Sequence, residues 1–241
     1  MVIGGFIITG NAPRRIIVRG IGPSLIAFGV TDALADPMIE LHASDGSLIR
    51  ANDNWRDTQE EEIIATGIPP ANDLESAIVD TLPPGSYTVI LRGRNQLTGV
   101  ALLEIYDLDR STASKVANIS TRAFVQTGDN VLIGGFILGG SNPRNVIVRA
   151  IGPSLTRVGL TNVLMDPTLE LRDHNGTLLI SNDNWKDNDP QAHQIKIIGL
   201  APTDDRESAL IATLGPGQYT AIVAGKNGGI GIGLVEIYNL Q

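Results

Sequence analysis

The feature that most constrains the fold of this chain is a long internal repeat. Residues 4–25 and 134–155 are identical at 15 of 22 aligned positions. The tetrapeptide Asn-Asp-Asn-Trp at 52–55 returns at 182–185. An internal repeat of this length determines the domain count before any other pattern is considered. The sequence therefore predicts two copies of one fold within 241 residues.

The two copies begin differently. The second copy has the segment 116–131 ahead of its Gly-Gly-Phe motif, and most of that segment has the residue types of a β-strand. The first copy has only Met1, Val2 and Ile3 in the corresponding place. We therefore expect one strand to be missing from the first copy, unless the chain is a slice of a longer array or another chain supplies the strand.

Length and composition agree with two small domains. Each copy has about 110 to 130 residues, which is enough for one hydrophobic core. We assign residues 1–110 to the first repeat, 111–115 to a linker of small and polar residues, and 116–241 to the second repeat. The 27 glycines and 13 prolines, together with many Val, Ile and Thr residues, favour short strands joined by tight turns.

Charge and residue content exclude several classes of function. The net charge of −8 argues against nucleic-acid binding, which needs a concentrated basic face. The absence of cysteine excludes disulfides, thiolate metal sites and cysteine catalysis. The sequence has no window of 18 consecutive apolar residues, so no membrane-spanning helix is predicted.

Short runs of β-branched residues alternate with turn sequences in both copies. Asp45-Gly46 and Asn175-Gly176, each between apolar runs, are strong hairpin signals. In the first copy the predicted strands cover residues 2–9, 14–21, 38–43, 47–51, 76–81, 86–92 and 99–106. The second copy repeats them and adds a strand at 117–126, and short helical turns are predicted at 57–66 and 188–200. This pattern predicts an all-β fold of two tandem antiparallel β-sandwich (jelly-roll-like) domains related by internal duplication.

The repeated Asn-Asp-Asn motif is a candidate calcium site. Calcium takes carboxylate and amide oxygens that are clustered on a loop. The candidate ligands each carry a side-chain carboxylate or amide oxygen and follow the predicted hairpin of their copy: Asn52, Asp53, Asn54, Asp57, Asn182, Asp183, Asn184 and Asp187. The competing interpretation is that these side chains hydrogen-bond their own backbone and end the strand. The spacing does not satisfy the EF-hand pattern.

Trp55 and Trp185 are the only tryptophans, and they occupy equivalent places in the two copies. A carbohydrate-binding module would expose such rings for stacking on sugars, so both are candidate ligand-binding residues. The alternative is that each ring fills its unit's core directly after a structural turn.

Charged residues inside apolar strands indicate ion pairs within each unit. Arg19 and Arg149 lie in such strands, and glutamates at 40, 104, 170 and 236 lie in others. Because charges in these settings are rarely buried alone, we expect an Arg–Glu pair in each copy.

No catalytic constellation is predicted. Ser24 and Ser154 stand in Gly-Pro-Ser-Leu, which is not the Gly-x-Ser-x-Gly nucleophile elbow. The histidines at 42, 174 and 193 occupy positions that are not equivalent in the two copies. We therefore expect the chain not to be an enzyme.

Two motifs resemble a known family. Ala/Ser-Asn-Asp-Asn at 51–54 and 181–184 follows a hairpin turn, and Leu-Pro-Pro-Gly-Ser-Tyr at 82–87 precedes an alternating strand. This pattern resembles bacterial pre-peptidase C-terminal (PPC)-like β-sandwich domains. The whole chain also resembles a tandem repeat of large, predicted secreted proteins of environmental bacteria. The resemblance implies an extracellular or cell-surface accessory domain without catalysis.

We therefore expect an extracellular structural module that self-associates. A sandwich without one strand exposes unpaired backbone groups that an added strand can fill. If a neighbouring subunit donates that strand, the contact is head-to-tail, and one that does not close gives a filament. The candidate donor is the strand at 117–126, with Ala117, Ile119, Thr121, Ala123 and Val125 as its assembly residues. The alternative function is a calcium-stabilised module that binds a polysaccharide or cell-wall polymer.

Overall fold

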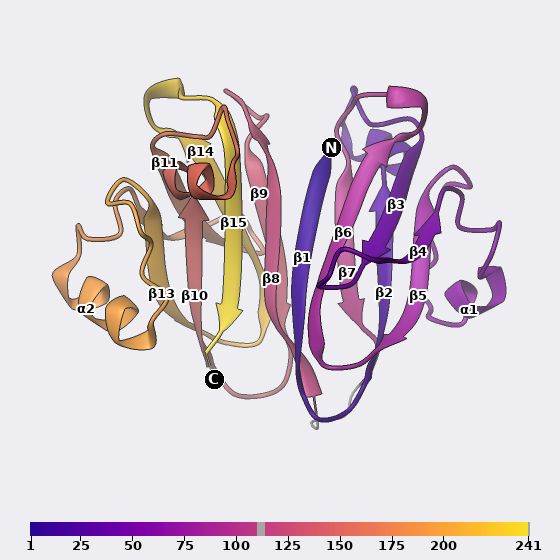
Figure 1. Ribbon diagram of the computed structural model, residues 1–241, viewed down its shortest axis with the longest axis horizontal. Coiled ribbons are helices and arrows are strands. Elements are labelled where there is room, and N and C mark those ends of the chain that lie inside the picture. The colour runs from indigo at the N-terminus through magenta and orange to yellow at the C-terminus, as the bar shows by residue number, and fades with distance from the viewer. Residues whose placement is uncertain (110–113, 241) are drawn as a thin grey trace. The chain divides into compact units, whose positions relative to one another are not determined.

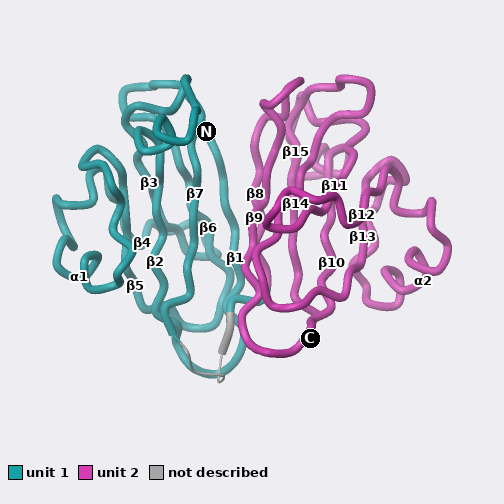
Figure 2. Tube along the Cα trace, turned by 180° about the vertical axis from the view of Figure 1, so that it is seen from behind, with its two compact units in different colours: residues 1–117 teal, residues 118–241 magenta. Residues whose placement is uncertain are grey.

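The computed structural model describes residues 1–109 and 114–240, and most of them lie in antiparallel β-sheets. The chain divides into two compact units, residues 1–117 and 118–241. Figure 2 colours the two units separately. Residues 111–113 of the predicted linker lie outside the described residues.

Unit 1 is a sandwich of two antiparallel sheets. One sheet has the strand order β1-β6-β3-β4 and the other β5-β2-β7. The strands are β1 (Val2–Gly10), β2 (Arg14–Ile21), β3 (Pro37–His42), β4 (Leu48–Asn52), β5 (Ser76–Leu82), β6 (Gly85–Gly93) and β7 (Leu102–Asp107). Two 3-10 turns, η1 (Pro23–Phe28) and η2 (Arg94–Gln96), join some of them.

Unit 2 contains the same elements in the same order, preceded by one more strand (Figure 1). Its two sheets have the orders β9-β14-β11-β12 and β8-β15-β10-β13. The strands are β8 (Ser114–Val125), β9 (Leu132–Leu138), β10 (Arg144–Ile151), β11 (Pro167–Asp173), β12 (Leu178–Asn182), β13 (Ser208–Leu214), β14 (Gly217–Gly225) and β15 (Gly231–Asn239), with turns η3 (Pro153–Val158) and η4 (Lys226–Gly228). β8 begins before the boundary between the units, and its segment from Asn118 onward belongs to unit 2.

The strand order of unit 2 defines a jelly roll. Its first strand lies beside its last, and the eight strands divide into two four-stranded sheets. Unit 1 has the same topology without the first strand, so its second sheet ends at β7. The predicted all-β sandwich fold is therefore confirmed.

The core of each unit lies between its two sheets, because inward-facing residues alternate with outward-facing ones along the strands. In β3, Ile39 and Leu41 are fully buried, whereas Glu40 and His42 face outward. In unit 1 these residues pack against Phe6 of β1 and the aliphatic side chains of the facing sheet. In unit 2 the equivalent cluster contains Phe136, Leu169, Val148 and Val235, together with further aliphatic residues. The period-2 pattern therefore determines which face of each strand is inside.

All predicted strands are present, with ends shifted by at most three residues. β7 starts at Leu102, three residues after its predicted start, because no strand pairs with residues 99–101 among the described residues. Val100 bonds only the loop, at Asp32 O and Leu34 N, whereas Ile232 makes the equivalent loop bonds in unit 2 and also lies opposite Phe124 of β8. β8 starts at Ser114, so the last two residues of the predicted linker belong to a strand.

Short helices cover the outer face of one sheet in each unit. α1 (Glu60–Ile64) and α2 (Asp189–Ile198) lie on the connections where helical turns are predicted. α2 is the longer because the Asn188 side chain accepts a hydrogen bond from Gln191 N and Gly199 ends the helix in a left-handed conformation. α1 has no side-chain cap at its N-terminus. Each helix inserts one fully buried isoleucine, Ile63 or Ile195, beside a tryptophan.

Candidate functional site

The strand that distinguishes the two units is β8, which pairs antiparallel with β15. The register runs from Asn118 opposite Tyr238 to Val125 opposite Gly231. Ile119, Thr121, Ala123 and Val125 alternate along β8, opposite four β15 residues that face the core: Ile237, Val235, Gly233 and Gly231. Val125 is fully buried and Ala123 packs against the core cluster. The predicted assembly residues are thus the inward-facing residues of this strand, and Ala117 precedes the paired segment and lies in unit 1.

The corresponding edge of unit 1 is open. Within residues 1–109 and 114–117, β7 pairs with β2 and lies at the edge of its sheet. Leu103 and Ile105 are only partly buried, whereas their counterparts Val235 and Ile237 are 0% and 6% exposed. The difference is the cover that β8 gives to β15. The edge of β7 therefore presents both backbone groups and partly covered core side chains.

The predicted donor strand is already in use. β8 pairs with β15 over eight residue pairs, and Asn118 Nδ2 also donates to Ile237 O at 3.2 Å. A neighbouring copy that took this strand would leave β15 uncovered, so the exchange would add no pairing. β8 instead shows what kind of strand could pair with β7, because it occupies the position in unit 2 that is open in unit 1.

The Gly-Pro-Ser-Leu motif is a structural anchor around a buried glutamate. Glu75 is fully buried, and its carboxylate accepts hydrogen bonds from Gly22 N (3.1 Å), Ser24 N (2.9 Å), Ser24 Oγ (2.9 Å) and Asn72 N (3.2 Å). The Ser24 hydroxyl donates to Glu75, and no histidine takes part in these contacts. The arrangement holds the η1 turn against the start of β5.

Unit 2 repeats this anchor. Glu207 is fully buried and accepts from Gly152 N (3.1 Å), Ser154 N (2.8 Å), Ser154 Oγ (2.7 Å) and Asp204 N (3.4 Å). Because a buried carboxylate needs several donors, all four bonds are required to offset its desolvation. This anchor was not predicted from the sequence. The signal that could have found it is the repetition of Glu-Ser-Ala, at 75–77 and 207–209, together with the repeated Gly-Pro-Ser motif.

The first asparagine of each predicted calcium motif bonds the backbone, whereas the second, Asn54 or Asn184, donates to the side chain of Asp57 or Asp187. Asn52 Oδ1 accepts from Ala77 N at 2.9 Å, and its Nδ2 donates to Asn54 O at 3.0 Å. Asn182 makes the same bonds, to Ala209 N at 3.1 Å and Asn184 O at 3.0 Å. These contacts end β4 and β12 and tie them to β5 and β13, as the strand-ending interpretation predicts.

The aspartates of the same motif contact basic side chains. Asp53 pairs with Arg94, and Asp183 pairs with Lys226. Burial raises the pKa of Asp53, the negative charges of Asp36 and Asp57 raise it further, and Arg94 lowers it. Among the described residues, no three carboxylate or imidazole side chains are gathered closely enough to hold a metal ion.

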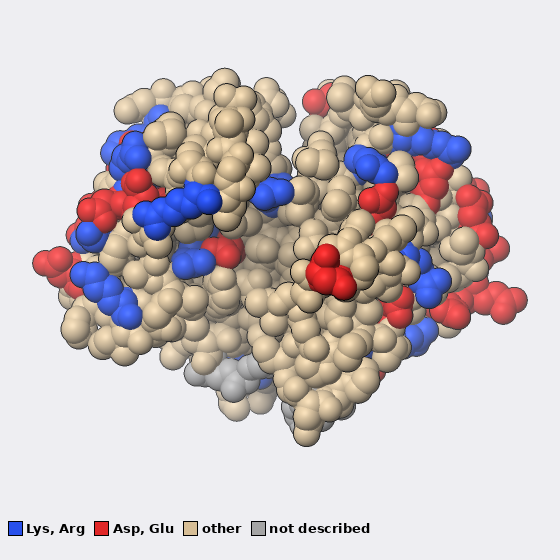
Figure 3. Space-filling model, viewed as in Figure 1, with Lys and Arg blue, Asp and Glu red and all other residues tan. Residues whose placement is uncertain are grey.

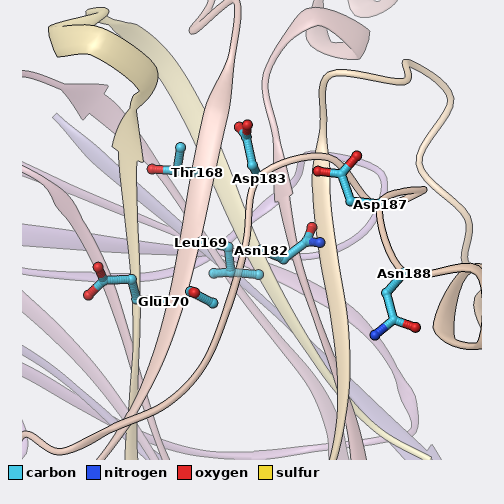
Figure 4. Close-up of a pocket in the computed structure, with 8 residues that line it drawn as sticks. Thr168, Leu169, Glu170, Asn182, Asp183, Asp187 and Asn188 are labelled. Carbon is cyan, nitrogen blue, oxygen red and sulfur yellow. The ribbon is translucent and has the colours of Figure 1, made fainter.

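Some oxygens of this cluster are nevertheless buried without a hydrogen-bond donor. They are one carboxylate oxygen each of Asp36, Asp53, Asp166 and Asp183, and the amide oxygen of Asn54. In unit 2, the loop that carries Asp183 borders an open cavity of about 470 Å³. Figure 4 shows the residues that line this cavity: Glu170 lies on β11, and Asp183, Asp187 and Asn188 lie on the loop that follows β12.

Both tryptophans are core residues. Trp55 is 2% exposed and Trp185 is 3% exposed, and their indole N–H groups donate to Asn72 O (3.1 Å) and Asp204 O (3.2 Å). Arg56 and Lys186 lie over the rings at 4.1 and 5.1 Å from the ring centroids. A sugar needs an exposed ring face, so the prediction that Trp55 and Trp185 bind a carbohydrate is wrong.

The predicted Arg–Glu pairs are present in both units. Arg19 contacts Glu104 and donates to Ile68 O at 2.8 Å, and Arg149 contacts Glu236 and donates to Leu200 O at 2.8 Å. A tyrosine completes each group, and burial together with the charge of Glu236 raises the pKa of Tyr238 to about 12. Because the arginine bonds a backbone carbonyl of the helix-containing connection, the group fixes that connection to the sheet.

The charged surface has no single dominant sign on the face shown in Figure 3, where basic and acidic side chains are interspersed. Many of these side chains form ion pairs, for example Arg92 with Glu40 and Arg172 with Glu170. Among the described residues, no helix is long and apolar enough to cross a membrane.

No protein-family model and no curated protein matches the sequence. Similar solved structures include a predicted secreted protein from Eubacterium rectale (10% identity, 97% of this chain and 68% of that chain, TM-score 0.24). Others are the PBCV-1 protein VP54 fitted into a reconstruction of the virophage Sputnik (8%, 99% and 93%, 0.21) and the infectious bursal disease virus VP2 subviral particle (12%, 95% and 58%, 0.22). At these TM-scores the similarity does not indicate a function.

Proposed function

We propose that the chain is a non-catalytic, extracellular structural module that joins neighbouring subunits by taking up a β-strand at the open edge of β7. The observation that carries this proposal is the difference between the two units. In unit 2, β15 is covered by β8, whereas in unit 1 the equivalent strand β7 has no such partner among the described residues. Open sheet edges are templates for strand addition.

The contacts of unit 2 indicate what an added strand would contribute. β8 pairs with β15 over eight residue pairs and helps to bury Val235 and Ile237. The same cover over Leu103 and Ile105 would remove two half-buried aliphatic side chains from water, a gain of about 2 kcal/mol. Because β7 and the donor strand are different surfaces, the contact is head-to-tail, and repeated contacts of this kind that do not close form a filament.

A grafted strand tests this proposal within the chain itself. In the variant, residues 114–131 are fused ahead of Val2, so that unit 1 carries its own copy of β8. We expect the unfolding midpoint of unit 1 to rise by roughly 5–10 °C, because about 2 kcal/mol is gained in a domain of this size. Differential scanning calorimetry measures the midpoint, and light scattering after size exclusion measures association.

The same graft separates strand uptake from other modes of association. Because β8 is already paired with β15, oligomers or fibres of the unmodified chain require another donor strand, and the graft should abolish any that form because β7 is then covered. The matched control carries the graft with Thr121 and Ala123 replaced by proline, which removes two backbone donors from the added strand. A monomeric unmodified chain at high concentration, with no stabilisation by the graft, would contradict the proposal.

One observation favours a second candidate, a calcium-stabilised module. The buried oxygens without donors recur in both units, at Asp36 and Asp53 and at Asp166 and Asp183. On this candidate, calcium replaces the attraction that Arg94 and Lys226 give to these carboxylates. The polysaccharide partner of this candidate no longer has the tryptophans as binding residues, since both are buried.

Calcium addition discriminates between the two candidates. On the second candidate, about 5 mM calcium exceeds the dissociation constants of extracellular calcium modules and raises the thermal midpoint relative to EDTA. Asp53→Asn with Asp183→Asn should remove that rise, and magnesium serves as the control cation. On the strand-uptake proposal alone, the midpoint is the same in calcium, magnesium and EDTA.

A further inference from the structure

β7 and β15 hold equivalent places in their sheets by backbone register, independently of sequence similarity. In unit 1, Glu104 lies opposite Arg19 and Leu103 lies opposite Gly20. In unit 2, Glu236 lies opposite Arg149 and Val235 lies opposite Ala150. The position that β8 takes beside β15 therefore defines, residue by residue, the position of a strand beside β7.

We propose, on the basis of the function proposed above, that β7 selects an antiparallel strand with small inward side chains and a basic outward side chain. In the register of β8, the inward positions lie opposite Leu103, Ala101 and Gly99. In unit 2 the equivalent inward positions are filled by Thr121, Ala123 and Val125 of β8, which lie opposite Val235, Gly233 and Gly231. The partner is thus an extended polypeptide of defined size pattern rather than any strand.

The size limit follows from two residues of unit 1, Ala101 just before β7 and Leu103 within it, which stand in place of Gly233 and Val235. Gly233 faces the core of unit 2, and a Cβ atom there would lie 3.1 Å from Val125 Cγ2. Unit 1 has Ala101 at this position, so the Cβ that would crowd Val125 is already present. Leu103 is likewise larger than Val235. A strand that fits β7 therefore needs inward side chains no larger than those of β8, and a smaller one at the position of Val125.

The preference for a basic residue follows from charge. Arg122 lies opposite Leu234, on the same outward face as Glu236 and two positions from it along the ladder. The equivalent neighbour in unit 1 is Glu104. Residues 1–117 contain 15 acidic and 9 basic residues, so the surface around β7 belongs to an acidic unit. A basic side chain at the position of Arg122 is attracted to this surface, and cross-strand neighbours of opposite charge stabilise a pair of strands.

Labelled peptides provide the test, with the full chain as the receptor. The reference peptide has the sequence of residues 116–127, and fluorescence anisotropy measures its dissociation constant. We expect Ala123→Leu in the peptide to weaken binding about tenfold, because the added atoms overpack the core. Val125→Ala should bind at least as tightly as the reference. Arg122→Glu should bind more weakly, with a difference that shrinks as salt is added.

A control peptide separates the outcomes. Phe124→Leu is the matched control, because Phe124 faces outward and is 49% exposed on β8. Its affinity should stay close to that of the reference peptide. If no peptide binds, including the reference, then strand uptake itself is overturned together with this inference. If all peptides bind equally, strand uptake stands, but the inferred register, size limit and charge preference are wrong.

Discussion

Glu75→Ala should destabilise unit 1 by about 3–5 kcal/mol, since it leaves several buried donors without an acceptor. The lost bonds come from Gly22 N, Ser24 N, Ser24 Oγ and Asn72 N, all within 3.2 Å of the carboxylate. Each buried donor without a partner costs about 1–3 kcal/mol. Urea denaturation followed by tryptophan fluorescence measures the change in a Trp185→Phe background, where Trp55 of unit 1 is the only tryptophan.

A matched pair of variants gives this measurement its control. Glu61→Ala removes an exposed carboxylate from α1 and should change the free energy of unfolding by less than about 0.5 kcal/mol. Glu75→Gln should fall between the two, because one carbonyl oxygen still accepts while the new amide N–H₂ faces other donors. A loss below about 1 kcal/mol for Glu75→Ala would mean that water replaces the carboxylate and that the anchor is not structural.

Gly22→Ala and Gly152→Ala should each cost about 3 kcal/mol or more, since the added methyl group overpacks a fixed turn. A Cβ atom on Gly22 would overlap the carbonyl oxygen of Leu34, and one on Gly152 would overlap that of Leu164. These clashes are with backbone, so no side-chain rotation relieves them. The amide of each glycine also donates to the buried glutamate, so any shift of the turn weakens that bond too.

Gly139→Ala is the matched control, because a Cβ atom there meets nothing within 4 Å. Its thermal midpoint should lie close to that of the unmodified chain, while both turn variants should unfold several degrees lower. Equal midpoints for Gly22→Ala and Gly139→Ala would show that the η1 turn can move away from Leu34. That result would contradict the role assigned to the Gly-Pro-Ser-Leu motif.

The sandwich fold was predictable because its signals are local. Alternation along β3 and the Asp-Gly and Asn-Gly turns depend on neighbouring residues, which is why strands and hairpins were found within three residues of their ends. The start of β7 was not predictable, because it depends on whether another strand lies beside residues 99–101. The equivalent residues 231–233 pair with β8 and belong to β15, whereas 99–101 have no such partner among the described residues. Nothing in residues 99–101 themselves signals that difference.

The candidate sites depended on longer distances in sequence, and this limited their prediction. The bond between Glu75 and Ser24 spans 51 residues, so neither residue alone indicates an anchor. Asp36 and Asp166 join the Asp53 and Asp183 clusters from a different loop, and no motif marks them. The tryptophans illustrate another limit, because residue type does not reveal which way a ring faces, and both proved to be buried. The prediction of a missing strand needed no knowledge of contacts, because it came from comparing the two copies.

The pairing of β8 with β15 also determines how unit 2 bears mechanical load. The chain enters unit 2 at Asn118, and β15 ends at Asn239, one residue beyond Tyr238, which lies directly opposite Asn118. Tension applied along the chain therefore pulls apart the adjacent ends of two antiparallel strands. Under that geometry the ladder bonds are loaded one after another, from the Asn118 end toward Val125, rather than all together in shear. Unit 2 would yield by unzipping at low force and lengthen the chain before its core is strained.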